Sequence, residues 1–145
     1  MRPQRDRLAR LLLPLALAGC AAPTARHEPA AAESVKPGIN EPFLDPDLDV
    51  ARFVERFEGE SREVFAARED IVAAIGLLPG QDVVDVGAGT GPFEGFLADA
   101  VGSEGKVYAV DIAPRFVEHV ARRVEEEGHP QVEARLCSET SIELP

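Results

Sequence analysis

A glycine-rich loop between an apolar run and an amphipathic stretch constrains this fold more than any other feature of the chain. Residues 82–86 read DVVDV, which is typical of a short strand buried on both faces. Residues 87–91 follow as GAGTG, and residues 93–101 carry an apolar stripe at helical spacing. Glycine lets a ligand approach the backbone closely, and the start of a helix favours an anionic group. The sequence therefore predicts a ligand site at this strand-to-helix turn.

Strands and helices are predicted to alternate beyond the loop. Residues 106–111 and 132–136 form two further strands, and residues 116–124 form a helix between them that Gly128 and Pro130 terminate. The order strand, helix, strand, helix, strand requires right-handed crossovers and a parallel sheet. We therefore expect half of a doubly wound α/β fold, with helices on both faces of the sheet.

Two amphipathic helices are predicted before the first strand. Apolar residues at helical spacing over residues 50–57 indicate the first helix, which Gly59 ends. A second, longer helix would stop before the turn at residues 78–80. Its apolar stripe, with Phe65 beside it, is expected to belong to the core. The stripe consists of Val64, Ala67, Ile71, Ala74 and Ile75.

The spacing of the glycines distinguishes among the nucleotide sites that such a turn can form. A dinucleotide loop reads G-x-G-x-x-G, whereas Pro92 occupies the place of its third glycine here. Asp85 also stands at a strand end that dinucleotide-binding dehydrogenases usually keep apolar. No Lys-Ser/Thr pair follows the loop, so a P-loop is excluded. A nicotinamide dinucleotide is accordingly disfavoured.

Residues 85–91, DVGAGTG, resemble the first motif of class I S-adenosylmethionine-dependent methyltransferases. Asp111 adds to the resemblance, because it ends the second strand twenty residues after Gly91. Residues 77–80 and 105–111 are similar to those of small-molecule and quinone-type methyltransferases, and the whole resemblance covers residues 77–145. It implies a Rossmann-like, doubly wound parallel sheet of about seven strands, of which this chain supplies the first three, preceded by two helices.

The resemblance implies S-adenosyl-L-methionine as the cofactor and gives roles to residues around the loop. Asp85 would help to hold the ammonium, and Asp111, followed by Ile112, would accept hydrogen bonds from both ribose hydroxyls. Glu139 would lie against the adenine amine, although residues 137–139 read CSE where GDA is commoner. On the residues alone, Asp85 could instead cap a turn and Glu139 could be solvated. The loop that would admit the methionine part comprises Gly87, Ala88, Gly89, Thr90 and Gly91.

The reaction implied is in-line attack of an acceptor on the cofactor's methyl group, aided by alignment and desolvation. The sequence indicates no catalytic residue. With 26 acidic against 15 basic side chains, the chain carries a formal charge of −11, which disfavours nucleic acid as a partner. We therefore expect a small-molecule acceptor. His119 and His129 have no second ligand at metal spacing, so no metal is expected.

Three strands leave the first strand's far edge open, and an open apolar edge invites pairing with another chain. The sequence is then either part of a longer product or a truncated relative. An alternative function is consequently a catalytically inactive, membrane-tethered binding or interaction protein on a methyltransferase scaffold.

The first 46 residues are predicted to export and tether the domain. Residues 1–19 read as a signal peptide, because four arginines precede an apolar run too short to span a membrane. Residues 17–20, LAGC, resemble the bacterial lipoprotein signal, which implies lipidation of Cys20. Residues 20–46 form an Ala/Pro-rich tether, and residues 47–145 form the folded domain. The expected location is the bacterial cell envelope, lipid-anchored on the periplasmic side, and Ala21 weakly favours the outer membrane.

Overall fold

The computed structural model describes residues 36–59, 62–142 and 144, and its strands form one parallel sheet. The sheet order is β1 (Asp82–Val86), β2 (Lys106–Asp111) and β3 (Val132–Leu136). Val84 pairs with Tyr108, and Ala109 pairs with Ala134. The three predicted strands, their bounds and the parallel arrangement are therefore confirmed.

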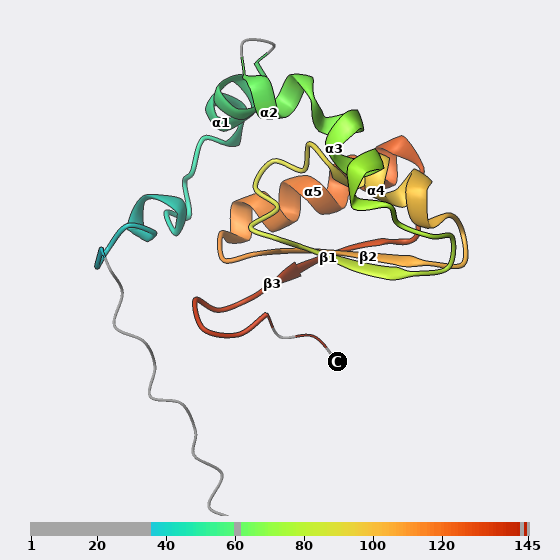
Figure 1. Ribbon diagram of the computed structural model, residues 1–145. Helices are drawn as coiled ribbons and strands as arrows, with labels where there is room; N and C mark the ends of the chain where they lie inside the picture. The colour runs from blue at the N-terminus through green and yellow to red at the C-terminus, as the bar shows by residue number, and fades with distance from the viewer. Residues whose placement is uncertain (1–35, 60–61, 143, 145) are drawn as a thin grey trace, which may run out of the picture. The chain divides into compact units, whose positions relative to one another are not determined.

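Two helices make the crossovers between these strands, and both lie on the same face of the sheet (Figure 1). α4 (Glu94–Val101) packs on β1 and β2, α5 (Pro114–Glu127) packs on β2 and β3, and the two helices contact each other. The expectation of helices on both faces is wrong for the described residues. Two successive right-handed crossovers that progress in one direction across a sheet must place both helices on one side.

The burial of β1 differs from the prediction for the same reason. Val83 packs toward the helices, whereas Val86 is 65% exposed. Successive residues of a strand face opposite sides of the sheet, so Val86 points away from the side that Val83 packs against and stays exposed. The position of the strand was predicted correctly, and its burial on both faces was not.

The main core lies between the sheet and the crossover helices. Val107 and Ala109 of β2 are buried against apolar side chains of α4 and α5. Gly76 and Gly128 end α3 (Arg68–Ile75) and α5 in the left-handed conformation, as expected of a glycine that follows a helix. The helix residues in this core are Val72, Leu97, Ala98, Val101, Val120 and Val124.

The longer helix predicted before β1 is broken into α2 (Glu63–Ala66) and α3. The guanidinium of Arg68 stacks 3.9 Å from the centre of the Phe65 ring, and its Nη1 donates to the Phe65 carbonyl at 2.6 Å. The expected apolar stripe does not face the core, since Val64 and Ile75 are each more than half exposed. Val72, which is not in that stripe, is buried in its place.

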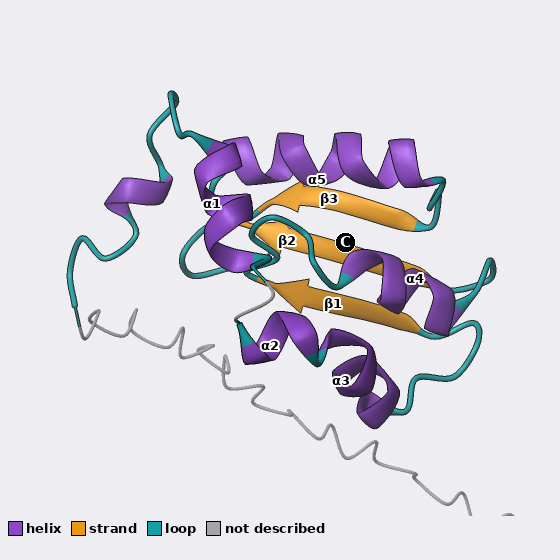
Figure 2. Ribbon diagram, turned by 90° about the horizontal axis from the view of Figure 1, so that it is seen from above, coloured by secondary structure: helices purple, strands orange, loops and turns teal. Residues whose placement is uncertain are grey.

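A second, aromatic cluster joins the N-terminal segment to the start of α5. The first predicted helix is confirmed as α1 (Val50–Phe57), and a short 3₁₀ helix, η1 (Glu41–Phe43), precedes it. Figure 2 shows α1 lying beside the N-terminal end of α5. The cluster contains Phe43, Leu48, Phe53, Phe57, Ala113 and Phe116. Ordered packing thus begins before residue 47, within the segment predicted to be a tether.

The predicted signal peptide and Cys20 lie outside the described residues. Among those that are described, none belongs to a helix with the length and hydropathy needed to cross a membrane.

Candidate functional site

The glycine loop sits at the carboxyl ends of β1 and β2, where the backbone makes a tight turn. The N–H groups of Gly87 and Ala88 both donate to the carbonyl of Val110, at 2.8 and 3.1 Å. Gly91 has a φ of +81°, and a Cβ there would lie 3.0 Å from Cγ2 of Val120. The turn therefore requires glycine at this position, for both backbone conformation and space.

Asp111 ties the end of β2 to the loop. Its Oδ2 accepts a hydrogen bond from the N–H of Gly89, and its Oδ1 accepts one from the N–H of Ala113, both at 2.8 Å. These bonds fix the carboxylate at the edge of a pocket that it helps to line. A carboxylate has about four acceptor sites, so Asp111 retains capacity for hydroxyl donors of a ligand.

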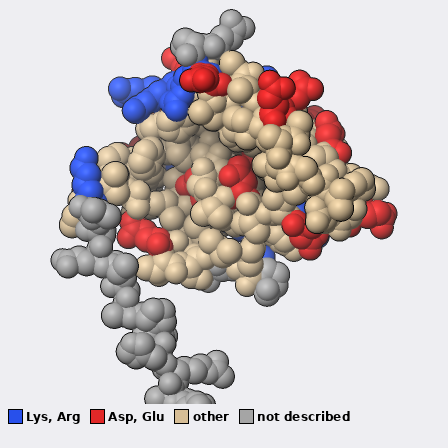
Figure 3. Space-filling view, viewed as in Figure 1, with Lys and Arg blue, Asp and Glu red and all other residues tan. Residues whose placement is uncertain are grey.

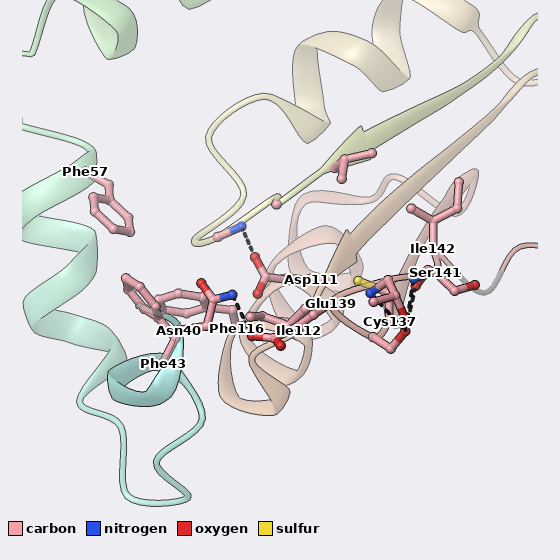
Figure 4. Close-up of a pocket in the computed structure, with 15 residues that line it drawn as sticks. Asn40, Phe43, Phe57, Asp111, Ile112, Phe116, Cys137, Glu139, Ser141 and Ile142 are labelled. Atoms are coloured by element: carbon pink, nitrogen blue, oxygen red, sulfur yellow. Dashed lines mark hydrogen bonds between the residues drawn. The ribbon is translucent and has the colours of Figure 1, made fainter. Parts of the chain in front are cut away.

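The pocket has a volume of about 810 Å³ and opens between the loop, the N-terminal segment and the chain after β3 (Figure 4). Aromatic rings of η1, α1 and α5 form its apolar wall, through Phe43, Phe57 and Phe116. The charged residues that line it are Asp111 and Glu139, and its described lining contains no Lys or Arg. Figure 3 shows acidic side chains beside the hollow on this face. The pocket thus suits an uncharged or positively charged ligand.

One hydrogen bond spans the pocket between segments far apart in the chain. Nδ2 of Asn40 donates to Oε1 of Glu139 at 2.8 Å (Figure 4). Both residues line the pocket, which brings residues before α1 next to the segment that follows β3. Sequence reasoning missed Asn40, because a lone polar residue in a Pro-rich stretch carries no periodic signal.

Two carboxyl groups lie underneath the loop, facing the helices. The side chains of Asp85 in β1 and Glu94 in α4 interact electrostatically. Burial, and then the charge of Asp85, raise the pKa of Glu94 to about 8. Burial also raises the pKa of Asp85, partly opposed by the interaction with Glu94, and Asp111 adds a further upward influence. The pair therefore favours sharing one proton over the ionisation of both carboxyl groups.

Comparisons with known proteins show which family this arrangement resembles. Residues 83–145 match the family model described as "Methyltransferase domain". A SAM-dependent methyltransferase of known structure from Aquifex aeolicus superposes with a TM-score of 0.59 at 32% identity, over 68% of this chain and 52% of that chain. Residues 83–145 are thus similar to part of a methyltransferase domain.

Two curated relatives each match part of this chain. A protein-L-isoaspartate O-methyltransferase from Aeropyrum pernix is 37% identical over 67 residues, which are 46% of this chain and 26% of that protein. A tRNA (adenine(57)-N(1)/adenine(58)-N(1))-methyltransferase from Methanocaldococcus jannaschii is 43% identical over 53 residues, which are 37% of this chain and 18% of that protein. The chain therefore spans about a quarter or less of the length of these relatives.

The predicted Rossmann-like fold is confirmed, and so, at the level of the family, are the methyltransferase class and S-adenosylmethionine as its cofactor. The two curated relatives are named for different acceptors, a protein and a tRNA.

The predicted site residues fall into two groups, one that lines the pocket and one that lies behind its lining. Five of them line the pocket: Gly87, Gly89, Asp111, Ile112 and Glu139. The other four, which do not line it, form the loop's inner layer and the end of β1: Asp85, Ala88, Thr90 and Gly91. Sequence reasoning missed the aromatic wall as a site feature, because Phe43, Phe57 and Phe116 equally fit apolar core positions.

A partly buried arginine fastens the end of α1 to the glycine loop. Nη1 of Arg123 donates to both carboxylate oxygens of Glu58, at 2.9 and 3.0 Å, and to the carbonyl of Thr90 at 3.2 Å. Glu58 follows the last residue of α1, which is Phe57. This ion pair therefore holds the aromatic wall next to the glycine loop.

Proposed function

We propose that this chain binds S-adenosyl-L-methionine in the pocket at the glycine loop and that the protein transfers its methyl group to a small, uncharged or cationic acceptor. The observation that carries the cofactor site is the position of Asp111. Its carboxylate is fixed by two backbone N–H groups and lines the pocket beside Gly87 and Gly89. A carboxylate held in this way accepts hydrogen bonds from a ribose without having to be ordered first.

The remaining contacts would follow the shape of the pocket. The loop glycines allow the methionine part to approach the backbone, and Ile112 with the aromatic wall offers apolar surface to the nucleoside. Glu139 accepts a hydrogen bond from the adenine amine in place of the one that it accepts from Asn40 in the free protein. When bound, S-adenosylmethionine supplies an electrophilic methyl group on a sulfonium. The acidic lining favours the positive charge of that sulfonium.

The test of the cofactor site is calorimetric titration of the full chain with S-adenosylhomocysteine. We expect saturable binding by the wild type and its loss in Asp111→Ala. The matched control is Asp99→Ala, because Asp99 is an exposed acid on α4 that does not line the pocket. Equal binding by the wild type and Asp111→Ala would contradict the proposed ribose contact. No binding by the folded wild type would contradict the cofactor site itself.

The acidic lining also supports the proposed acceptor class. A polyanionic substrate would have to approach Asp111 and Glu139, and the described lining offers no Lys or Arg to neutralise its phosphates, while the chain carries a charge of −11. Incubation of a bacterial extract with the full chain and methyl-labelled cofactor should place the label in the ultrafiltrate of small molecules. Label retained on RNA or protein would contradict a small-molecule acceptor.

We also propose that the chain is anchored through a lipid on Cys20, on the periplasmic side of the cell envelope. The basic start, the short apolar run and the LAGC sequence support this location. A chain expressed in bacteria should incorporate a labelled fatty acid and sediment with membranes. Cys20→Ser should lose both properties, whereas Cys137→Ser, the matched control, should keep them.

A further inference from the structure

The hydrogen bond that spans the pocket lies where the proposed adenine contact would form. Nδ2 of Asn40 donates to Oε1 of Glu139 at 2.8 Å, and both side chains line the pocket (Figure 4). This bond is called the Asn40–Glu139 strap below. The proposed adenine contact uses Glu139 in place of the strap. The adenine amine and the Asn40 amide therefore compete for one carboxylate.

The backbone around Asn40 is fixed, and its side chain is not used to cap the helix that follows. The carbonyl of Asn40 accepts the N–H of Phe43 at 2.9 Å, and the ring centre of Phe43 lies 6.2 Å from that of Phe116. An asparagine directly before a helix commonly caps it through its side chain, but the Asn40 side chain makes no such bond to η1. Its amide reaches Glu139 instead (Figure 4).

The other end of the strap is held next to Asp111, the residue that the proposed ribose contact needs. The N–H of Cys137 donates to the carbonyl of Asp111 at 3.0 Å. The N–H of Ser138 donates to the carbonyl of Ser141, also at 3.0 Å, and Glu139 lies within the turn that this bond closes. The backbone is thus fixed at both ends of the strap, so rotation of two side chains is sufficient to open it.

Water limits the strength of the strap. Glu139 is exposed and Asn40 is half-buried, so water can replace either partner. A single bond of this kind favours the closed form of the pocket severalfold without locking it. When only a fraction of a protein is competent to bind, its apparent affinity for the ligand falls in proportion to that fraction.

We propose that Asn40 is an inhibitory residue of the pocket: it holds Glu139 in the free protein and must release it before the adenine of the cofactor can bind. This inference rests on the proposed cofactor site. The strap lowers the affinity for adenine nucleosides about fivefold, which is the ratio of closed to open pockets that one such bond maintains. A purely structural role predicts the opposite sign, because loss of a structural bond would loosen the aromatic wall and weaken binding.

NMR spectroscopy can observe the strap directly, because Asn40 is the only asparagine in the sequence. The full chain, labelled with ¹⁵N-asparagine and kept in detergent, contains one labelled side-chain NH₂ pair. Glu139→Ala gives the position of this pair when the strap is open. Saturation of the wild type with S-adenosylhomocysteine should move the pair away from its position in the free protein, as Glu139→Ala does.

Affinity provides a second measurement, made by calorimetric titration with S-adenosylhomocysteine. Asn40→Ala should bind about fivefold more tightly than the wild type, because its pocket has no closed form. The gain should vanish when Asn40→Ala is combined with Glu139→Ala, since the strap needs both partners. Gln81→Ala is the matched control: it removes an exposed amide that does not line the pocket, and it should leave the affinity unchanged.

The outcomes separate the strap from the cofactor site on which it depends. If the wild type binds S-adenosylhomocysteine while the NH₂ pair of Asn40 stays in place, the role of Asn40 is overturned and the cofactor site remains. Equal or weaker binding by Asn40→Ala would overturn that role as well. If neither the wild type nor Asn40→Ala binds, both proposals fail.

Discussion

Asp111 accepts a hydrogen bond from the N–H of Gly89, twenty-two residues earlier in the chain, at 2.8 Å. The same carboxylate accepts the N–H of Ala113, so it joins the glycine loop, the end of β2 and the start of α5. Only 9% of Asp111 is exposed, so little of its surface is accessible to water that could replace these bonds. The residue proposed to bind the ribose is thus also a structural support of the loop.

Asp111→Asn should therefore destabilise the fold as well as weaken cofactor binding. The amide cannot accept both backbone N–H groups, because one of its two polar atoms is itself a donor. We expect a loss of about 2 kcal/mol in the free energy of unfolding, as for a buried charged hydrogen bond. Denaturant unfolding without cofactor measures this loss. Asp99→Asn, an exposed control, should change stability by less than about 0.5 kcal/mol, and an equal loss in both variants would contradict the argument.

Gly91→Ala tests the packing of the loop on α5. Gly91 and Gly128 have nearly the same φ, +81° and +80°, so alanine imposes a similar backbone strain of about 1–2 kcal/mol at each position. Only at Gly91 would the new Cβ meet other groups, with Val120 Cγ2 at 3.0 Å and Glu94 Oε2 at 3.2 Å. Gly91→Ala should lower the melting temperature clearly more than Gly128→Ala. Similar losses would show that the space around Gly91 can relax.

The strands and the loop could be predicted from the sequence because their signals are local. Each strand is a short apolar run next to a glycine or a turn, so its bounds need no information from the rest of the chain. The helix that breaks at Ala67 was not predictable in this way. Arg68 stacks on the ring of Phe65 and donates a hydrogen bond to its carbonyl. Side-chain contacts of this kind cannot be predicted from the spacing of apolar residues.

The site could be predicted only in part, for the same reason. The glycines and Asp111 follow from a motif, but Asn40 reaches Glu139 across ninety-nine residues. Glu94 falls at a helix position where an acid is ordinary, since the first turn of a helix favours negative charge. Its burial against Asp85 depends on how closely α4 packs on β1, which no sequence pattern records.

Glu58→Gln should weaken the attachment of α1 to the loop. Glu58 and Arg123 are mostly buried, with side chains 12% and 27% exposed, and Arg123 also bonds the carbonyl of Thr90. Loss of the charge leaves the guanidinium without the more buried of its two carboxylate partners, which should cost about 1–3 kcal/mol. Glu127→Gln is the matched control, because the same arginine contacts Glu127 in a more exposed pair worth less than about 1 kcal/mol.

The second consequence of Glu58→Gln concerns the pocket. Phe57, the neighbour of Glu58, lies 3.9 Å from where a Cβ on Gly89 would be, so a looser α1 loosens the aromatic wall. We expect faster hydrogen exchange of the α1 amides and weaker binding of S-adenosylhomocysteine in Glu58→Gln. Unchanged exchange in α1 would mean that the aromatic cluster alone holds the helix.

The buried proton of Glu94 should make stability fall as pH rises. The pKa of Glu94 is about 8 in the folded protein and near 4.5 as an ordinary carboxyl group. Between these values the unfolded chain loses the proton and the folded chain keeps it, so unfolding becomes easier as pH increases. The stabilising effect of protonation is complete below about pH 4.5 and exhausted above about pH 8.

Glu94→Gln removes this dependence, because glutamine has no proton to lose. The difference in melting temperature between Glu94→Gln and the wild type should grow from about pH 5 to pH 8 in favour of the variant, and stay constant above that. Glu125→Gln, exposed on α5, should show no such trend. A constant difference over the whole range would mean that Glu94 is ionised in the folded protein. Asp85 would then face a second charge, and no cation is among the described groups that act on the pKa of either acid.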